Sequence, residues 1–64
     1  MEPLLNEIEE FCMAHSLAET RFGELALGDK PFVSQLRAGR DVRMSTARRV
    51  RAFMAEYTAT ERAA

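Results

Sequence analysis

The spacing of hydrophobic residues predicts helices along most of the chain. Over residues 3–15, side chains suited to a core recur at the i, i+1, i+4, i+7, i+8 and i+11 positions of one helical face: Leu4, Leu5, Ile8, Phe11, Cys12 and His15. Pro3 fits the first helical turn, where backbone N–H groups have no helical partner. The pattern predicts an amphipathic helix over residues 3–15, with His15 positioned to cap carbonyls at its C-terminal end.

A second helix is predicted over residues 17–27. Ser16 and Glu19 have the spacing of a capping box, in which a hydroxyl precedes a glutamate by three residues. Phe22 and Ala26 would form its buried stripe. The helix also contains Leu25 and Leu27, so either both close over the core or one is exposed at a contact with another subunit.

A tight turn follows this helix. Gly28 can adopt the positive φ that a turn between helices requires, and the Asp29 side chain can accept N–H groups at the start of the next helix. Pro31 is tolerated in a first turn. Gly23 is a small residue at which two helices could cross closely.

A third, short helix is predicted over residues 30–38, ending at Gly39. Val33 and Leu36 lie three residues apart and would face inward. The side chains expected to face solvent are Ser34, Gln35 and Arg37.

A fourth helix is predicted to begin at Ser45 or Thr46 and to continue to about residue 58, with Val42 or Met44 tucked beneath the loop before it. Its apolar stripe is Ala47, Val50, Phe53, Met54 and Tyr57. The tail over residues 58–64 would prolong this helix, form a further turn of its own, or fray.

Together these elements predict a small all-α fold, a four-helix bundle or a five-helix one if the tail forms its own turn. No β-branched residues alternate with polar ones over four positions, so no strand is expected. The 64 residues are expected to form a single domain, 1–64, with a helix-turn-helix whose second helix contacts DNA.

The distribution of charge supports a polyanionic partner. The net charge is −1, yet residues 1–20 contain five glutamates and no Lys or Arg, whereas residues 30–51 contain seven basic side chains and one acidic, Asp41. A local basic surface favours nucleic acid, and Arg in particular suits phosphate and guanine. The alternative is a solvated face whose arginines pair with the acidic first helix.

The sequence argues against an enzyme. Cys12 is the only cysteine and His15 the only histidine, so no internal disulfide, thiolate zinc site or catalytic triad is expected. Cys12 is expected to be a small buried hydrophobe. No phosphate-binding glycine loop is present, and we expect no cofactor, metal or small-molecule substrate. Without a membrane segment or signal peptide, a cytosolic protein is expected.

Particular residues are candidates for DNA contacts. The predicted base-reading residues are Lys30 and the exposed side chains Ser34 and Gln35, because Lys can donate to guanine and Gln can bind adenine through two hydrogen bonds. Phe32 would touch a thymine methyl or pack on the second helix. The N-terminus of the second helix would approach the DNA backbone, where Glu19 would repel phosphate. The predicted phosphate contacts are Arg37, Arg40, Arg43 and Arg48.

Residues 17–57 resemble the lambda-repressor-like helix-turn-helix domains, the group that includes the Cro-type repressors. Gly23 matches the small residue of the family's second helix, and Val33 and Leu36 match the buried pair of its recognition helix. Gly39-Arg40 and residues 45–50 (STARRV) match the end of that helix and the start of the fourth.

The resemblance implies a transcription regulator of bacterial or phage origin, active in the cytosol or nucleoid, and places Lys30, Pro31 and Gln35 where the family contacts bases. The chain departs from the pattern in two places. Leu27 occupies the usual position of the turn glycine, which comes one residue later at Gly28, and Pro31 offers no hydrogen bond, which favours recognition of DNA shape.

Two hypotheses follow. The first is a DNA-binding regulator, a homodimer on a two-fold symmetric operator that acts by occupying it. The second is a helical protein-interaction module, antitoxin-like or an adaptor, without direct DNA contacts. Its working surface would be the acidic first helix or the excess leucines of the second.

Overall fold

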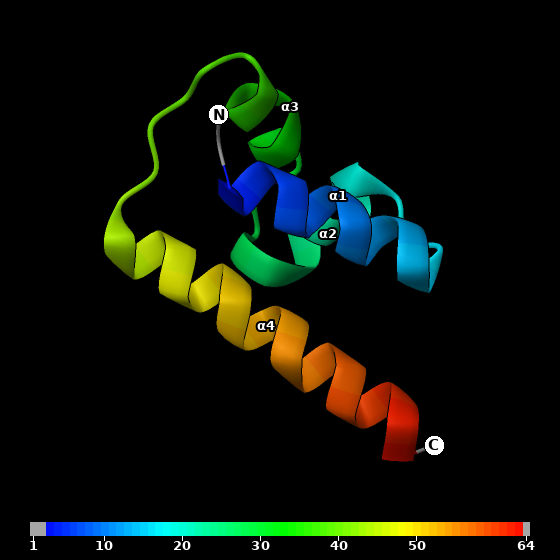
Figure 1. Cartoon of the computed structure of the whole chain (residues 1–64). Coiled ribbons are helices and arrows are strands. Elements are labelled where there is room, and N and C mark those ends of the chain that lie inside the picture. The colour runs from blue at the N-terminus through cyan, green and yellow to red at the C-terminus, as the bar shows by residue number, and fades with distance from the viewer. Residues whose placement is uncertain (1–2, 64) are drawn as a thin grey trace.

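The computed structural model of the chain describes residues 3–63, which form four α-helices and no strand. The helices are α1 (Pro3–His15), α2 (Glu19–Leu27), α3 (Phe32–Arg37) and α4 (Met44–Ala63). In Figure 1, α1, α2 and α3 gather into one cluster, and the long α4 crosses beneath it. The all-α prediction is therefore confirmed. Within the described residues, no helix combines the length and apolar character needed to cross a membrane.

The core draws on all four helices. Its buried members are Leu4, Ile8, Cys12, Phe22, Phe32, Val33, Leu36 and Val50. The hydrophobic spacing thus identified the inward face of each helix correctly. Cys12 is a buried free thiol, as expected.

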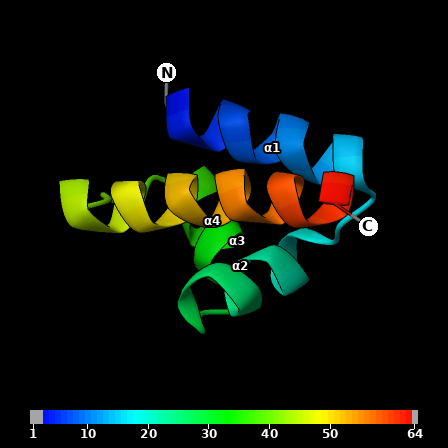
Figure 2. The ribbon, with the colours of Figure 1, turned by 90° about the horizontal axis from the view of Figure 1, so that it is seen from below.

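α1 and α4 lie side by side and run in the same direction (Figure 2). Phe11 on α1 has ring contacts with Phe53 and Tyr57 on α4, with centroid separations of 6.3 and 5.5 Å. Further along, His15 hydrogen-bonds to Glu61 and lies 3.4 Å, through Nε2, from the Thr58 hydroxyl. The prediction that His15 caps the carbonyls of α1 is therefore wrong, because its ring turns toward α4.

The end of α1 also changes how α2 begins. Ser16 adopts a left-handed conformation with φ 52°, and the Leu17 N–H donates to the Cys12 carbonyl at 2.9 Å. Ser16 therefore terminates α1 and does not cap α2, whose N-cap is Ala18, with no side-chain hydrogen bond. The predicted capping box is wrong, and α2 begins at Glu19.

Gly28 forms the predicted turn after α2, with φ 66° and its N–H bonded to the Glu24 carbonyl at 2.9 Å. The Asp29 N–H donates to the Gly23 carbonyl at 3.1 Å, and the Asp29 carbonyl accepts from the Phe32 N–H at 3.1 Å. No side chain caps α3, so the predicted capping by the Asp29 carboxylate is wrong. Lys30 and Pro31 belong to the turn, which makes α3 shorter than expected.

Gly23 allows α2 and this turn to approach closely. A Cβ atom on Gly23 would lie 2.3 Å from the Asp29 carbonyl oxygen and 3.3 Å from the Phe32 Cβ. A close approach at Gly23 is confirmed, but its nearest neighbour is the backbone of the turn, with Phe32 at the start of α3 next, and not a second helix crossing at that point.

An extended segment over residues 40–43 connects α3 to α4 (Figure 1). Val42 packs against the core, while Met44 is 71% exposed. Helix α4 begins at Met44, so Ser45 and Thr46 lie within its first turn and are not its N-cap. Residues 58–63 prolong α4, which is one of the three outcomes expected for the tail.

Candidate functional site

Helix α3 is buried on one side and open on the other. Phe32, Val33 and Leu36 are buried, whereas Ser34 and Gln35 are exposed, as are Lys30 and Pro31 in the preceding turn. Phe32 has no exposed surface, which decides in favour of packing and against contact with a thymine methyl. The four predicted base-reading residues therefore lie on the surface within and just before one short helix.

Arg40 folds back onto α3. Its Nη1 donates to the Asp29 carboxylate at 3.0 Å and to Gln35 Oε1 at 2.6 Å. Its guanidinium carbon lies 5.2 Å from the centroid of the Phe32 ring, a cation–π arrangement. Arg40 was predicted to contact phosphate, but here its guanidinium contacts Asp29 in the turn before α3 and Gln35 and Phe32 on α3 itself.

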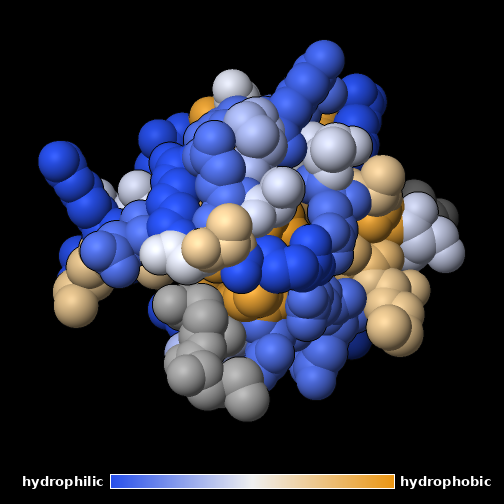
Figure 3. All heavy atoms as spheres, turned by 90° about the horizontal axis from the view of Figure 1, so that it is seen from above, coloured by the Kyte–Doolittle hydropathy of each residue, from blue (hydrophilic) through white to orange (hydrophobic). Residues whose placement is uncertain are grey.

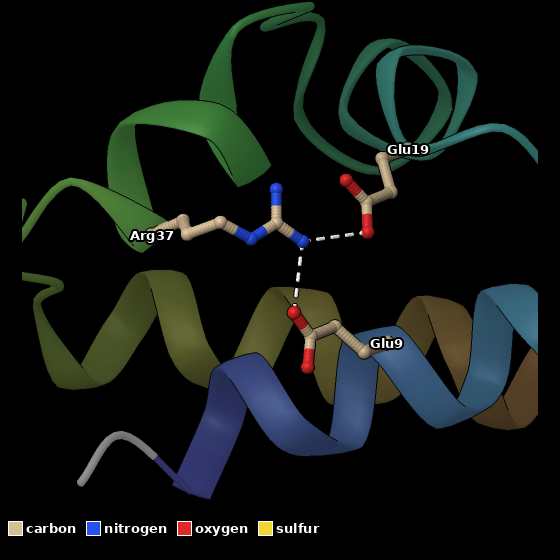
Figure 4. A network of polar contacts seen from close by, with 3 residues as sticks. All are labelled: Glu9, Glu19 and Arg37. Atoms are coloured by element: carbon tan, nitrogen blue, oxygen red, sulfur yellow. Dashed lines mark hydrogen bonds and ion pairs between the residues drawn. The ribbon is translucent and has the colours of Figure 1, made fainter.

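Arg37 joins three helices (Figure 4). Its Nη2 lies 2.8 Å from a carboxylate oxygen of Glu19 on α2 and 2.8 Å from one of Glu9 on α1. Hydrogen bonds to Glu19 and then Glu9 raise the pKa of Arg37 above its ordinary value. The same contacts compensate the charge of Glu19, which would otherwise repel a phosphate at the start of α2.

A second arginine pairs with α1. Arg51 donates to both carboxylate oxygens of Glu7, at 3.1 and 2.9 Å, and this hydrogen bonding lowers the pKa of the Glu7 carboxyl. The alternative stated for residues 30–51, the basic segment, was that its arginines pair with the acidic first helix. Arg37 and Arg51 do so, with Glu9 and Glu7.

Four cations of the basic segment have no acidic partner among residues 3–63: Lys30, Arg43, Arg48 and Arg49. All four are exposed, and Arg48 makes only a 3.6 Å contact to the Met44 sulfur. A cavity of about 300 Å³ lies beneath the connection to α4, lined by Phe32, Arg40, Asp41, Val42, Arg43 and Thr46. The free cations thus occur in the turn before α3, in this connection and in the first turns of α4.

The face seen in Figure 3, on the side where α3 lies in Figure 1, is largely hydrophilic, with apolar side chains emerging only in small areas. No family model, curated protein or solved structure matches this chain.

Among residues 3–63, no group of three or more His, Cys, Asp or Glu side chains is placed to hold a metal ion. Burial, and to a lesser extent Glu19, raises the pKa of the Cys12 thiol, which disfavours the reactive thiolate.

Sequence reasoning missed the contact of Arg40 with Gln35 and foresaw the pairing of Arg37 only in general terms, as the alternative in which arginines pair with the acidic first helix. The spacing of five residues between Gln35 and Arg40 falls across the end of α3, where helical periodicity no longer says which side chains meet. The partners of Arg37 are 18 and 28 residues away in sequence. The excess of glutamate in the first helix was a general signal for such pairing, but it did not indicate which arginine would be held.

Proposed function

We propose that this chain binds double-stranded DNA through the exposed side of α3, as a transcription regulator of bacterial or phage type that acts by occupying its operator. The observation that supports this most is the composition of residues 30–37. This segment buries three large apolar side chains, and its exposed residues include no carboxylate. A short helix anchored from behind, with polar donors outward, suits the major groove.

Base contacts would come from Lys30, Ser34 and Gln35. Lysine donates to guanine, serine accepts or donates, and the glutamine amide offers both functions. Pro31 would press an apolar ring against the groove without hydrogen bonding and would favour particular DNA shapes.

Phosphate contacts would come from the cations that have no acidic partner. We assign Arg43 and Arg48 this role and add Arg49, which is exposed in the same first turns of α4. We assign Arg37 to holding α3 against α1 and α2, because both of its carboxylate partners lie within the protein. Exposed ion pairs are weak, so Arg37 remains able to exchange one carboxylate for a phosphate.

We further propose that the regulator binds as a homodimer on a two-fold symmetric site. A six-residue recognition helix reaches few base pairs, and a single small module buries less surface than most specific protein–DNA complexes. A second copy would double the contacts and set the spacing of the half-sites.

A double substitution of the recognition residues tests this proposal. The wild-type protein is first used to select duplexes from a random pool. The ratio of its affinity for these duplexes to its affinity for random duplex should fall at least about tenfold in the Lys30→Ala, Gln35→Ala double variant, because each good base contact contributes about 1–3 kcal/mol of discrimination. Thr60→Ala with Arg62→Ala is the matched control. It removes one cation and one polar side chain from exposed positions at the far end of α4 and should leave selectivity unchanged. Unchanged selectivity of the recognition variant would refute the assignment.

The alternative, a protein-interaction module, is favoured by one observation. Met13 and Leu25 are 82% and 43% exposed on the two helices that this hypothesis would use. A stable hetero-complex that is abolished by Met13→Ser or Leu25→Ser, together with no duplex binding at low salt, would establish it in place of DNA binding.

A further inference from the structure

The Gln35 side chain is held in place on the exposed side of α3. Its Oε1 accepts a hydrogen bond from Arg40 Nη1 at 2.6 Å. The backbone of the two residues is also joined, because the Arg40 N–H donates to the Gln35 carbonyl at 2.9 Å. The position of the Gln35 amide is therefore coupled to that of the Arg40 guanidinium.

Arg40 is itself fixed by two further contacts. The Asp29 carboxylate accepts from the same Nη1 at 3.0 Å, and the Phe32 ring lies beneath the guanidinium at 5.2 Å. Phe32 has no exposed surface, and the backbone of Asp29 is bonded to both α2 and α3. The guanidinium thus contacts a fully buried ring and a residue whose backbone is hydrogen-bonded on both sides, which gives it the means to orient Gln35.

The chemistry of the two side chains decides which end of the amide points outward. An arginine side chain has only donors, so the Gln35 atom that faces it has to be the oxygen. The amide nitrogen and its two N–H donors are then directed away from Arg40. A freely rotating glutamine recognises adenine by offering one acceptor and one donor together. A glutamine whose oxygen is already bonded offers chiefly donors.

We propose that Arg40 is a positioning residue that orients the Gln35 amide and so gives the protein a preference for guanine over adenine at the base pair that Gln35 contacts. Guanine presents two acceptors, N7 and O6, in the major groove, whereas adenine presents one acceptor and one donor. This inference rests on the proposed function, since it requires that Gln35 meets a base.

The base preference of four proteins tests the inference: wild type, Arg40→Ala, Arg43→Ala and Gln35→Ala. Gln35→Ala identifies the base pair concerned, as the position where selection from a random duplex pool loses its preference. There, the wild type should favour guanine over adenine by about tenfold, the effect of one good base contact. Arg40→Ala should abolish or invert this preference. Arg43→Ala, the control, removes a cation from the same connection without touching Gln35 and should weaken binding to all duplexes while preserving the preference.

Several outcomes would overturn the inference. These are a wild-type preference for adenine, no preference between the two bases, or an Arg40→Ala protein that loses affinity uniformly, as Arg43→Ala does. If circular dichroism shows that Arg40→Ala fails to fold, Asp29→Asn replaces it. This variant removes the Asp29 contact of Arg40 and keeps Arg40 itself, and it should reduce the guanine preference; an unchanged preference would refute the inference.

Nuclear magnetic resonance of the free protein separates this inference from the proposed function. The side-chain amide signals of Gln35 should show an ordered, shifted NH₂ pair that moves toward the values of a free glutamine in Arg40→Ala and stays in place in Arg43→Ala. If these signals respond as expected and no duplex is bound, the DNA-binding proposal fails while the positioning contact stands. If they do not respond to Arg40→Ala, the positioning role is overturned whatever DNA is bound.

Discussion

Replacement of Gly23 by alanine should disrupt the arrangement of α2 and α3. The new methyl group would lie 2.3 Å from the Asp29 carbonyl oxygen, far inside van der Waals contact, and 3.3 Å from the Phe32 Cβ. The first of these atoms belongs to the backbone of the turn, so no side-chain rotation relieves the clash. The turn has to move away from α2, which strains the hydrogen bond from the Asp29 N–H to the Gly23 carbonyl.

The loss of stability is estimated from two destabilising effects and one stabilising effect. Overpacking costs about 1–3 kcal/mol, and the weakened hydrogen bond adds about 1 kcal/mol. Alanine in place of glycine inside a helix returns about 1 kcal/mol. The net loss is about 2 kcal/mol, which corresponds to a fall in Tm of about 8–16 °C for a domain of this size. Since domains this small rarely exceed a stability of about 3–5 kcal/mol, a large share of the fold's stability is at stake.

Urea and thermal unfolding followed by circular dichroism measure this effect. Thr20→Ala is the matched control, because it also places an alanine in α2 but at an exposed position, and it should change stability by less than about 0.5 kcal/mol. A Gly23→Ala protein as stable as the wild type, or more stable, would show that helix propensity outweighs the close approach and would refute the reasoning.

Three further predictions concern other contacts. Burial raises the pKa of the Cys12 thiol above its ordinary value of 9.0, so the folded protein keeps this proton to a higher pH than the unfolded chain does. The free energy of unfolding, measured by urea titration, should therefore fall as the pH rises above 9.0, and Cys12→Ala should remove this dependence. Glu7, with its pKa lowered by Arg51, contributes stability that is present above its ordinary pKa of 4.5 and is lost as pH falls through the folded value. Glu7→Gln should therefore flatten the acid limb of the stability curve. His15→Ala removes ring contacts at 4.3 Å to Phe11 and 5.3 Å to Tyr57 and should cost about 1–2 kcal/mol, with faster amide exchange in the last turn of α4; unchanged exchange there would contradict the contact.

Hydrophobic periodicity was sufficient to predict the helices and their buried faces. Val33 and Leu36 are buried as expected, and helix 3–15 has the predicted bounds. Periodicity succeeds here because each helix has a single apolar face, which is buried only when that helix packs against the others.

The helix ends were harder to predict because the same residues suit two roles. Ser16 and Asp29 are good capping residues, yet Ser16 terminates α1 with its own backbone and Asp29 accepts through its carbonyl while its carboxylate binds Arg40. Local sequence shows which residues are able to cap a helix. The packing of α1, α2 and α3 determines which of them do.

The candidate site was predictable in outline only. The exposure of Lys30, Ser34 and Gln35 follows from the helical pattern around Val33 and Leu36. Which arginines pair with carboxylates of the protein and which face solvent depends on the distances between helices. Residue spacing along the chain does not give these distances. Of the four expected phosphate contacts, Arg37 and Arg40 are paired within the protein, whereas Arg43 and Arg48 have no acidic partner among residues 3–63.

A salt titration of duplex binding tests the DNA-binding proposal most directly. Each phosphate neutralised by the protein contributes a slope of about −0.9 to the plot of log affinity against log salt concentration. Contacts from Arg43, Arg48 and Arg49 therefore predict a slope of about −3 for each bound protomer, and each single substitution to alanine should reduce it by about 1. A slope near zero, or no binding to any duplex at about 50 mM salt, a concentration at which phosphate contacts are strong, would contradict the proposal.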